Sequence, residues 1–178
     1  MREYDFKLVF DLALVRLQVD ECVEALGTGG CDDAIVGVGK PGRISLQFVR
    51  EAESANAAVL GAIRDVQTAL PGASLLEAAP DYVGVTEVAV IVGCSRQNLR
   101  KLLLLGAAAT VPVPSPVHEG TSAIWHLALL LRWLRDEKRY RIADDLIELA
   151  SIAMQVNVAL DRRLAAAPEC DAIAALLA

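Results

Sequence analysis

The first eighty residues alternate between apolar and polar positions in a way that predicts strands separated by helices. Residues 6–10 and 44–48 place an aromatic or aliphatic side chain at every second position, which is the period of a strand with one buried face. Residues 34–38 and 73–79 are short apolar runs that predict two more strands. The Gly and Pro of residues 39–42 supply a turn, so the second and third strands are expected to form a hairpin.

Two helices are expected between these strands. Residues 17–26 predict a short helix that ends at the glycines that follow, and Ser54 can cap a second helix that ends at Pro71. The apolar side chains expected to face the core are Leu17, Val23 and Leu26 in the first helix and Val59, Ile63, Val66 and Leu70 in the second. The order β-α-β-β-α-β predicts a ferredoxin-like α+β domain over residues 1–80, with the helices on one sheet face and the other face free for a partner, a ligand or a second copy.

From Pro80 onward the pattern becomes helical. Residues 87–92, 96–105 and 124–137 predict helices, and residues 111–120 form a proline-punctuated loop. A last long helix is expected over residues 140–164. Its apolar residues follow a heptad-like seam, at Ile142, Leu146, Leu149, Ala153, Val156 and Leu160. Such a seam fits either packing within the chain or a dimer interface.

The strongest functional signal lies in residues 85–103. Thr86 is expected to cap the first helix of this segment, Gly93 to end it in the left-handed conformation, and Ser95 to cap the second helix. The side chains expected to pack inward are Val88, Ala89, Ile91, Val92, Leu99, Leu102 and Leu103. Two short helices joined by so tight a turn form a helix-turn-helix, whose second helix enters the major groove of DNA.

The second helix of this segment carries the side chains that DNA recognition requires. Arginine pairs with guanine through two hydrogen bonds, and glutamine and asparagine match the edge of adenine. A hydroxyl and free backbone amides at a helix start suit a phosphate oxygen. The expected base contacts are Arg96, Gln97, Asn98 and Arg100, and the expected phosphate contacts are Ser95 and Lys101.

Several short segments occur in a fixed order around this motif. They are Asp81-Tyr82-Val83, Glu87-Val88-Ala89, Gly93-Cys94-Ser95-Arg96-Gln97, Val111-Pro112-Val113-Pro114, Ile124-Trp125 and Arg132-Trp133-Leu134. In this order and spacing, residues 82–136 resemble the helix-turn-helix domains of the MerR and excisionase type. The resemblance implies a winged helix-turn-helix over residues 81–138, with residues 114–125 as a wing against the DNA backbone. Residues 30–34 also resemble part of the domain that precedes this motif in some bacterial regulators.

The wing and the following helix complete the expected DNA-binding surface. The further DNA contacts expected are Thr86, His118, Thr121, Ser122 and Arg132. Arg132 belongs to a basic group that fits either phosphate contact or a solvated helix face, and Trp125 and Trp133 are expected to anchor the core beneath the wing. Two features depart from the family: residues 102–105 are all leucine, and the wing carries Glu119 but neither Lys nor Arg.

Composition and charge limit the other possibilities. The net charge of −6 over 178 residues disfavours DNA binding unless cations are concentrated locally. Four cysteines and two histidines show no metal-ligand spacing, and Asp32-Asp33 is expected to lie in a solvated loop. His118 and His126 have no nucleophile or carboxylate partner at a recognisable spacing, so neither a cofactor nor an enzymatic activity is expected. Without a signal peptide or a membrane-length apolar run, the protein is expected to be cytoplasmic.

Together these features predict a transcriptional regulator of bacterial type that reads a specific sequence of double-stranded DNA. Because one helix-turn-helix makes few base contacts, a homodimer held by a C-terminal segment over residues 139–178 is expected. Two alternatives remain open. One is a protein-interaction adaptor, antitoxin-like or phage-derived, whose helix-turn-helix binds a partner. The other is a regulator whose N-terminal domain senses a metabolite.

Overall fold

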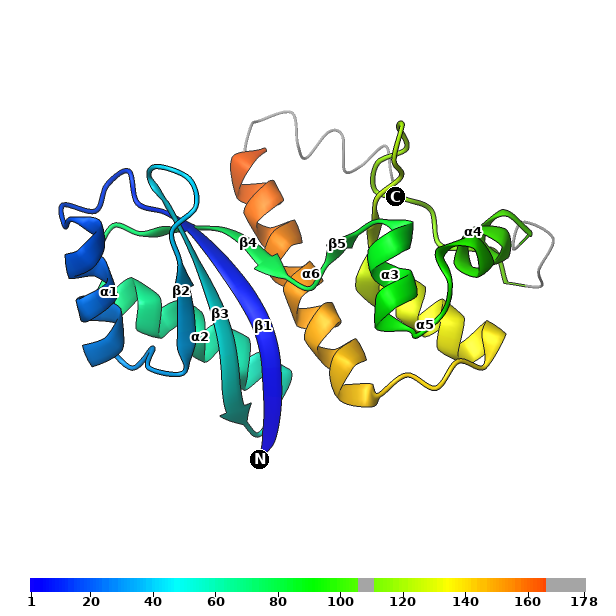
Figure 1. The fold of residues 1–178 in the computed structure, drawn as a ribbon, viewed down its shortest axis with the longest axis horizontal. Coiled ribbons are helices and arrows are strands. Elements are labelled where there is room, and N and C mark those ends of the chain that lie inside the picture. The colour runs from blue at the N-terminus through cyan, green and yellow to red at the C-terminus, as the bar shows by residue number, and fades with distance from the viewer. Residues whose placement is uncertain (106–110, 166–178) are drawn as a thin grey trace.

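A computed structural model describes residues 1–105 and 111–165 of the chain. These residues form a mixed α+β structure with six helices, a four-stranded antiparallel sheet and a small two-stranded sheet (Figure 1). The elements of the N-terminal half are β1 (Arg2–Asp11), α1 (Val19–Thr28), β2 (Ala34–Gly37), β3 (Arg43–Ala52), α2 (Ala55–Ala69) and β4 (Ser74–Ala79). Those of the second half are β5 (Tyr82–Val83), α3 (Val85–Ile91), α4 (Arg96–Leu105), β6 (Trp125–His126), α5 (Leu127–Lys138) and α6 (Asp144–Leu164).

The large sheet has the strand order β2-β3-β1-β4. The alternation along β1 and β3 decides which face is buried, because paired strands present residues of the same parity to the same side. Phe6 lies opposite Phe48 and Leu8 opposite Leu46, all with at most 1% of their surface exposed, and the two phenyl rings stack with centroids 5.2 Å apart. The period-two prediction for both strands is confirmed.

The opposite face of the sheet remains open to solvent. It carries Glu3, Asp5 and Glu51 at one end, and Glu3 lies directly opposite Glu51 in the register of β1 and β3. Exposed Ile35 and Val49 are its apolar members. Lys7 and Arg43 lie on the same face, so its charges are mixed, with an excess of carboxylates that does not favour contact with a nucleic acid.

Helix α1 is displaced from its predicted position. It begins after Gln18, whose backbone N–H donates to the carboxylate of Glu21. Leu17 therefore precedes the helix, and Leu17 and Val23 are 42% and 40% exposed, so the prediction that they face the core is wrong. The inward stripe consists of Cys22 and Leu26, which are fully buried and lie one turn apart.

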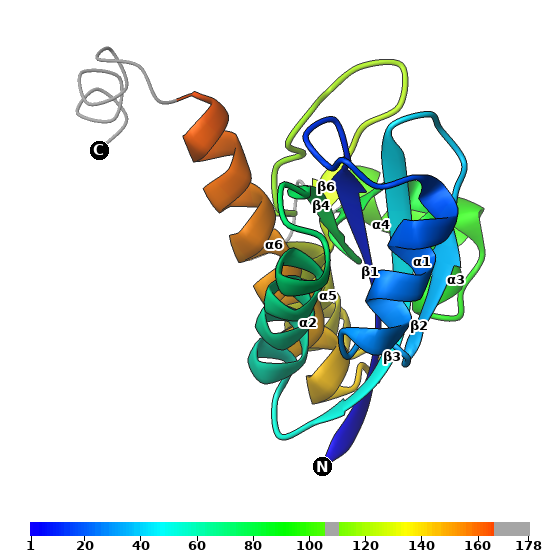
Figure 2. The same ribbon diagram turned by 90° about the vertical axis from the view of Figure 1, so that its left-hand side faces the viewer.

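Helix α2 is capped by Ser54, as its sequence predicts. The Ser54 hydroxyl accepts a hydrogen bond from the N–H of Ala57 at 3.1 Å. Buried alanines at positions 55, 58 and 62 allow close approach of neighbouring elements, and α6 lies alongside α2 (Figure 2). The carboxylate of Glu148 on α6 accepts from the N–H of Ala55 at 2.9 Å, which fixes the start of α2 against α6.

The sequence predicts that Asp33 lies in a solvated loop, but the structure places its carboxylate against Arg50. Its carboxylate accepts two hydrogen bonds from the guanidinium of Arg50, at 2.6 and 3.0 Å, and Asp65 on α2 accepts a third at 2.7 Å. The guanidinium also lies over the ring of Phe48, 5.0 Å from its centroid. Arg50 thus connects β3 to the residue that precedes β2 and to α2. Its partners are 17 and 15 residues away in sequence, so no local spacing pattern predicts this connection.

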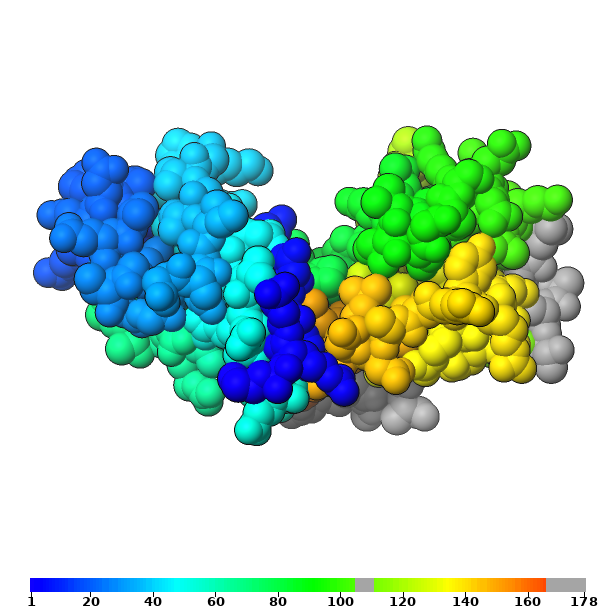
Figure 3. Space-filling model, turned by 60° about the horizontal axis from the view of Figure 1, so that its bottom comes forward, coloured from blue at the N-terminus to red at the C-terminus, as the bar shows by residue number. Residues whose placement is uncertain are grey.

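The buried apolar residues form two hydrophobic cores, one in each half of the molecule, and helix α6 contributes residues to both. Leu149 and Ala153 of the predicted seam are buried against the sheet and α2, while Ile147 and Ala150 are buried against α5. The helix begins at Asp144, four residues later than predicted at Tyr140. In the space-filling view a notch separates the N-terminal half from the helical half, and the start of α6 lies at its base (Figure 3). The seam is used within the chain, and residues 166–178 of the predicted C-terminal segment lie outside the described residues.

Candidate nucleic-acid interface

The turn between α3 and α4 has the local chemistry that the sequence predicts. Gly93 has a φ of +68°, a conformation that glycine adopts without steric cost. The N–H of Cys94 donates to the carbonyl of Ala89 at 2.9 Å, which closes the end of α3. The Ser95 hydroxyl then accepts from the N–H of Asn98 at 3.1 Å, which is the expected cap of α4.

The start of α3 differs from the prediction. Gly84, not Thr86, is the capping residue, and its N–H donates to the carboxylate of Glu87. Thr86 is an exposed residue inside the first turn. Val88 and Ala89 are buried as expected, but Ile91 is 38% exposed. Val92 follows Val88 and Ala89 at steps of four and three and packs with them, whereas Ile91 lies at the outer edge of this stripe and faces solvent.

Helix α4 is held by its leucines and exposes its polar residues. Leu99 is fully buried, and Leu102 and Leu103 are half-buried. Arg96, Gln97, Arg100 and Lys101 are all exposed. Within the described residues none of the three cations forms an ion pair. Their charge is therefore available to an external anion.

A hairpin stands beside α4. The N–H of Val117 donates to the carbonyl of Ile124 at 2.8 Å, and the N–H of Ile124 donates to the carbonyl of His118 at 3.0 Å. The chain continues into β6, which pairs with β5 just before α3. This pairing connects the hairpin of residues 117–124 to the segment that leads into α3.

The two tryptophans anchor the base of this arrangement, as predicted. Trp125 and Trp133 are 8% and 4% exposed. Their indole N–H groups donate to the carbonyls of Pro114 and Val111 at 3.1 and 3.2 Å. The proline-containing loop is thus fixed by two hydrogen bonds that satisfy otherwise buried indole donors.

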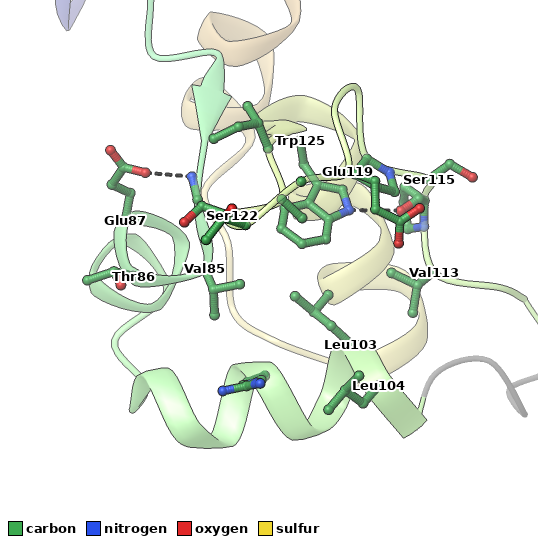
Figure 4. A pocket seen from close by; sticks show the side chains of 18 of the residues that line it. Val85, Thr86, Glu87, Leu103, Leu104, Val113, Ser115, Glu119, Ser122 and Trp125 are labelled. Atoms are coloured by element: carbon green, nitrogen blue, oxygen red, sulfur yellow. Dashed lines mark hydrogen bonds between the residues drawn. The ribbon is translucent and has the colours of Figure 1, made fainter.

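A groove of about 930 Å³ separates α4 from the hairpin. Figure 4 shows Trp125 at its centre, with Val85, Leu103 and Val113 between the indole and α4. Five of the predicted DNA-binding residues line this groove. They are Thr86, Arg96, Arg100, Thr121 and Ser122.

The other predicted site residues are exposed but lie elsewhere. Gln97 and Lys101 are on α4 and do not line the groove, and Ser95 precedes the helix. The side-chain amide of Asn98 donates to the Tyr140 hydroxyl at 3.2 Å, so it faces the α5–α6 connection. His118 lies at the hairpin bridge. Arg132 donates to the hydroxyl of Ser151 on α6 at 2.8 Å, which directs its guanidinium toward the α5–α6 contact.

A buried polar cluster that no sequence pattern predicts lies where the two halves meet. Asp81 has a fully buried side chain, and His126 Nδ1 lies 2.8 Å from its Oδ1. Asn157 on α6 donates to Asp81 Oδ2 and to the carbonyl of Ala78, and accepts from the N–H of Ala78, each at 2.8 Å. His126 therefore has a carboxylate partner, contrary to the prediction. The partners are 45 and 76 residues apart in sequence, which is why no spacing pattern points to them.

Tyr82 adds a second contact between α6 and the segment around β5. Its hydroxyl donates to Asp161 Oδ2 at 3.0 Å. Burial, together with this hydrogen bond and the nearby carboxylates, raises the pKa of Tyr82 to about 12. The folded protein therefore favours the neutral phenol more than the unfolded chain does.

The raised pKa of Tyr82 predicts a loss of stability in strong base. Between the ordinary pKa of 10 and about 12, the unfolded chain releases this proton while the folded chain keeps it. The free energy of unfolding therefore falls as pH rises through this window. Urea unfolding at several pH values checks this: Tyr82→Phe is expected to show a shallower fall than the unchanged protein. Equal slopes in the two proteins would contradict the assignment.

Neither a metal centre nor a membrane segment is present in the part of the chain that the structure describes. No group of three or more His, Cys, Asp or Glu side chains is placed to hold a metal ion there. None of the described helices combines the length and apolar character needed to cross a membrane. Comparison of the chain with protein families, curated proteins and solved structures finds no match.

Proposed function

We propose that this chain is a sequence-specific DNA-binding transcriptional regulator in which α4 is the recognition helix. The observation that supports it most is the surface of α4, where Arg96, Gln97, Arg100 and Lys101 are exposed and the three cations form no ion pair with residues 1–105 or 111–165. Buried Leu99 holds this helix to the fold. Arginine and glutamine have the hydrogen-bonding groups that distinguish base pairs in the major groove.

We also propose a ferredoxin-like N-terminal domain followed by a winged helix-turn-helix. The order β-α-β-β-α-β and the strand order β2-β3-β1-β4 support a ferredoxin-like N-terminal domain. The tight α3–α4 turn and the hairpin of residues 117–124 support a winged helix-turn-helix of the MerR type. In this arrangement the hairpin would lie along the DNA backbone, where Thr121 and Ser122 offer hydroxyl groups to phosphate.

Charge distribution reconciles the proposal with an acidic chain. The net charge is −6, but Glu3, Asp5 and Glu51 lie on the outer sheet face of the N-terminal half. The cations Arg96, Arg100 and Lys101 lie on α4, in the other half of the molecule. A locally positive surface is sufficient for phosphate contact, and a negative surface elsewhere orients the protein on DNA.

A cytoplasmic homodimer on a palindromic site completes the proposal. Because Leu149 and Ala153 of the α6 seam are buried within the chain, a dimer contact on this helix would use its outer face, where Val158 is 41% exposed. Two copies would double the base contacts available to one α4.

The salt dependence of DNA binding tests the proposal. The full chain is titrated against a labelled duplex of random sequence, and binding is followed by fluorescence anisotropy at increasing salt. The logarithm of the association constant is expected to fall linearly with the logarithm of the salt concentration, because each neutralised phosphate releases counterions. Absence of binding at low salt, or binding that salt does not weaken, would contradict the proposal.

A further inference from the structure

The groove between α4 and the hairpin has apolar walls that DNA recognition does not explain. Val85, Leu103, Val113 and Ile124 are half-buried on its sides, and Leu104 is 69% exposed beside them. The major groove of DNA offers little apolar surface besides the thymine methyl group. A phosphate backbone over these walls would leave their apolar surface without a matching partner.

The charges at this groove are positive on the α4 side. Arg96 and Arg100 both line it and lie one helical turn apart. Neither forms an ion pair with any residue that the structure describes. Of the two carboxylates that line the groove, Glu87 accepts the N–H of Gly84 and Glu119 is exposed on the hairpin. An anionic side chain would therefore find its complement along α4.

We infer that this groove binds a segment of a partner protein that carries aliphatic or aromatic side chains next to an aspartate or glutamate. The apolar side chains would pack on Leu103, Leu104 and Trp125, and the carboxylate would pair with Arg96 or Arg100. The volume of about 930 Å³ lies at the upper end of the range for ligand pockets, which leaves room for several side chains. Apolar anchors combined with a charge pair are the usual means by which a groove selects a peptide.

Occupation of the groove would also regulate the chain. Arg96 and Arg100 would be covered by the partner segment and so be withheld from DNA. This consequence rests on the proposed function, whereas the binding of the segment does not. The two can therefore be measured separately.

The test begins with selection on the full chain from a phage-displayed library of random short peptides. Enriched peptides are synthesised with a fluorescent label and titrated by anisotropy. They are expected to share an acidic residue beside an aliphatic or aromatic one. Leu104→Ser and Arg100→Gln are each expected to weaken binding about tenfold, because each removes one half of the recognition. Glu119→Gln is expected to strengthen it, because it removes the opposing charge.

Two matched controls separate the groove from general effects of the substitutions. Leu60→Ser and Arg64→Gln alter exposed residues of the same types on α2, and neither is expected to change peptide affinity. Far-ultraviolet circular dichroism and thermal unfolding show whether each variant remains folded. If Leu104→Ser lowers stability, Arg100→Gln and Glu119→Gln still test the site through opposite changes in affinity.

The outcomes distinguish this inference from the proposed function. Failure to enrich any peptide, or peptides whose affinity does not respond to Leu104→Ser, Arg100→Gln and Glu119→Gln, would overturn the groove as a peptide site. Addition of a groove-binding peptide to a complex with labelled duplex DNA is expected to release the DNA. A chain that binds the peptides but no duplex DNA would refute the proposed function and leave the peptide site standing. A chain that binds duplex DNA but no peptide would overturn the peptide site and leave the proposed function standing.

Discussion

Asn157→Ala is expected to lower the free energy of unfolding by about 3 kcal/mol, since each buried group left without a partner costs about 1–3 kcal/mol. Asn157 is 1% exposed and satisfies three groups: the N–H and carbonyl of Ala78 and one carboxylate oxygen of Asp81. Alanine would leave all three groups without this partner in the same buried place. The slightly better helix propensity of alanine offsets only a few tenths of a kcal/mol.

The matched control for this prediction lies on the same helix. Gln155 is an exposed residue of α6, and Gln155→Ala is expected to change the free energy of unfolding by less than about 0.5 kcal/mol. Urea denaturation followed by circular dichroism measures both variants. A loss of under about 1 kcal/mol in Asn157→Ala, well below the cost of several unsatisfied groups, would show that water replaces the amide and that the cluster does not hold the two halves together.

Arg100→Ala is expected to weaken specific DNA binding by about 1–3 kcal/mol, the value of a two-pronged contact with a base. Arg100 lies one turn after Arg96 on the exposed side of α4, and neither guanidinium is occupied by a described residue. Arg96→Ala is expected to have an effect of the same size. The measurement is an anisotropy titration of a duplex selected by the protein from random sequences.

Arg64→Ala is the control, because it removes the same charge from the exposed surface of α2. It is expected to leave DNA affinity nearly unchanged, which would separate a local contact from a change in net charge. Asn98→Ala is expected to weaken binding less than Arg100→Ala, since its amide is directed to the Tyr140 hydroxyl. If Arg64→Ala and Arg100→Ala weakened binding equally, Arg100 would have no direct role in reading DNA.

Features set by neighbouring residues could be predicted from the sequence. The buried faces of β1 and β3 follow from alternation, because the side-chain period of a strand is two. Ser54 and Ser95 cap α2 and α4 as predicted, since a cap depends on a hydroxyl and an N–H only three residues apart. Gly93 marks the α3–α4 turn for an equally local reason.

Features set by tertiary contact could not be predicted. The Asp81–His126–Asn157 cluster joins residues far apart in the chain, and nothing in the local pattern distinguishes Asp81 from a solvated carboxylate. Of the predicted DNA-binding residues, Asn98 and Arg132 have the right chemistry, but Asn98 donates to Tyr140 in the α5–α6 connection and Arg132 donates to Ser151 on α6. The sequence pattern of a helix shows which side chains are polar. It does not show which of these polar side chains another part of the fold will contact.

If α4 reads a sequence of bases, the chain binds the sequences that it selects more tightly than other DNA, and the ratio of specific to non-specific affinity measures this difference. Duplexes that the full chain selects from a random pool are compared with shuffled duplexes of the same composition, by anisotropy at one fixed salt concentration. The selected duplexes are expected to bind at least about a thousandfold more tightly, as they do to sequence-specific proteins. Equal affinity for selected and shuffled duplexes would contradict the reading of bases by α4.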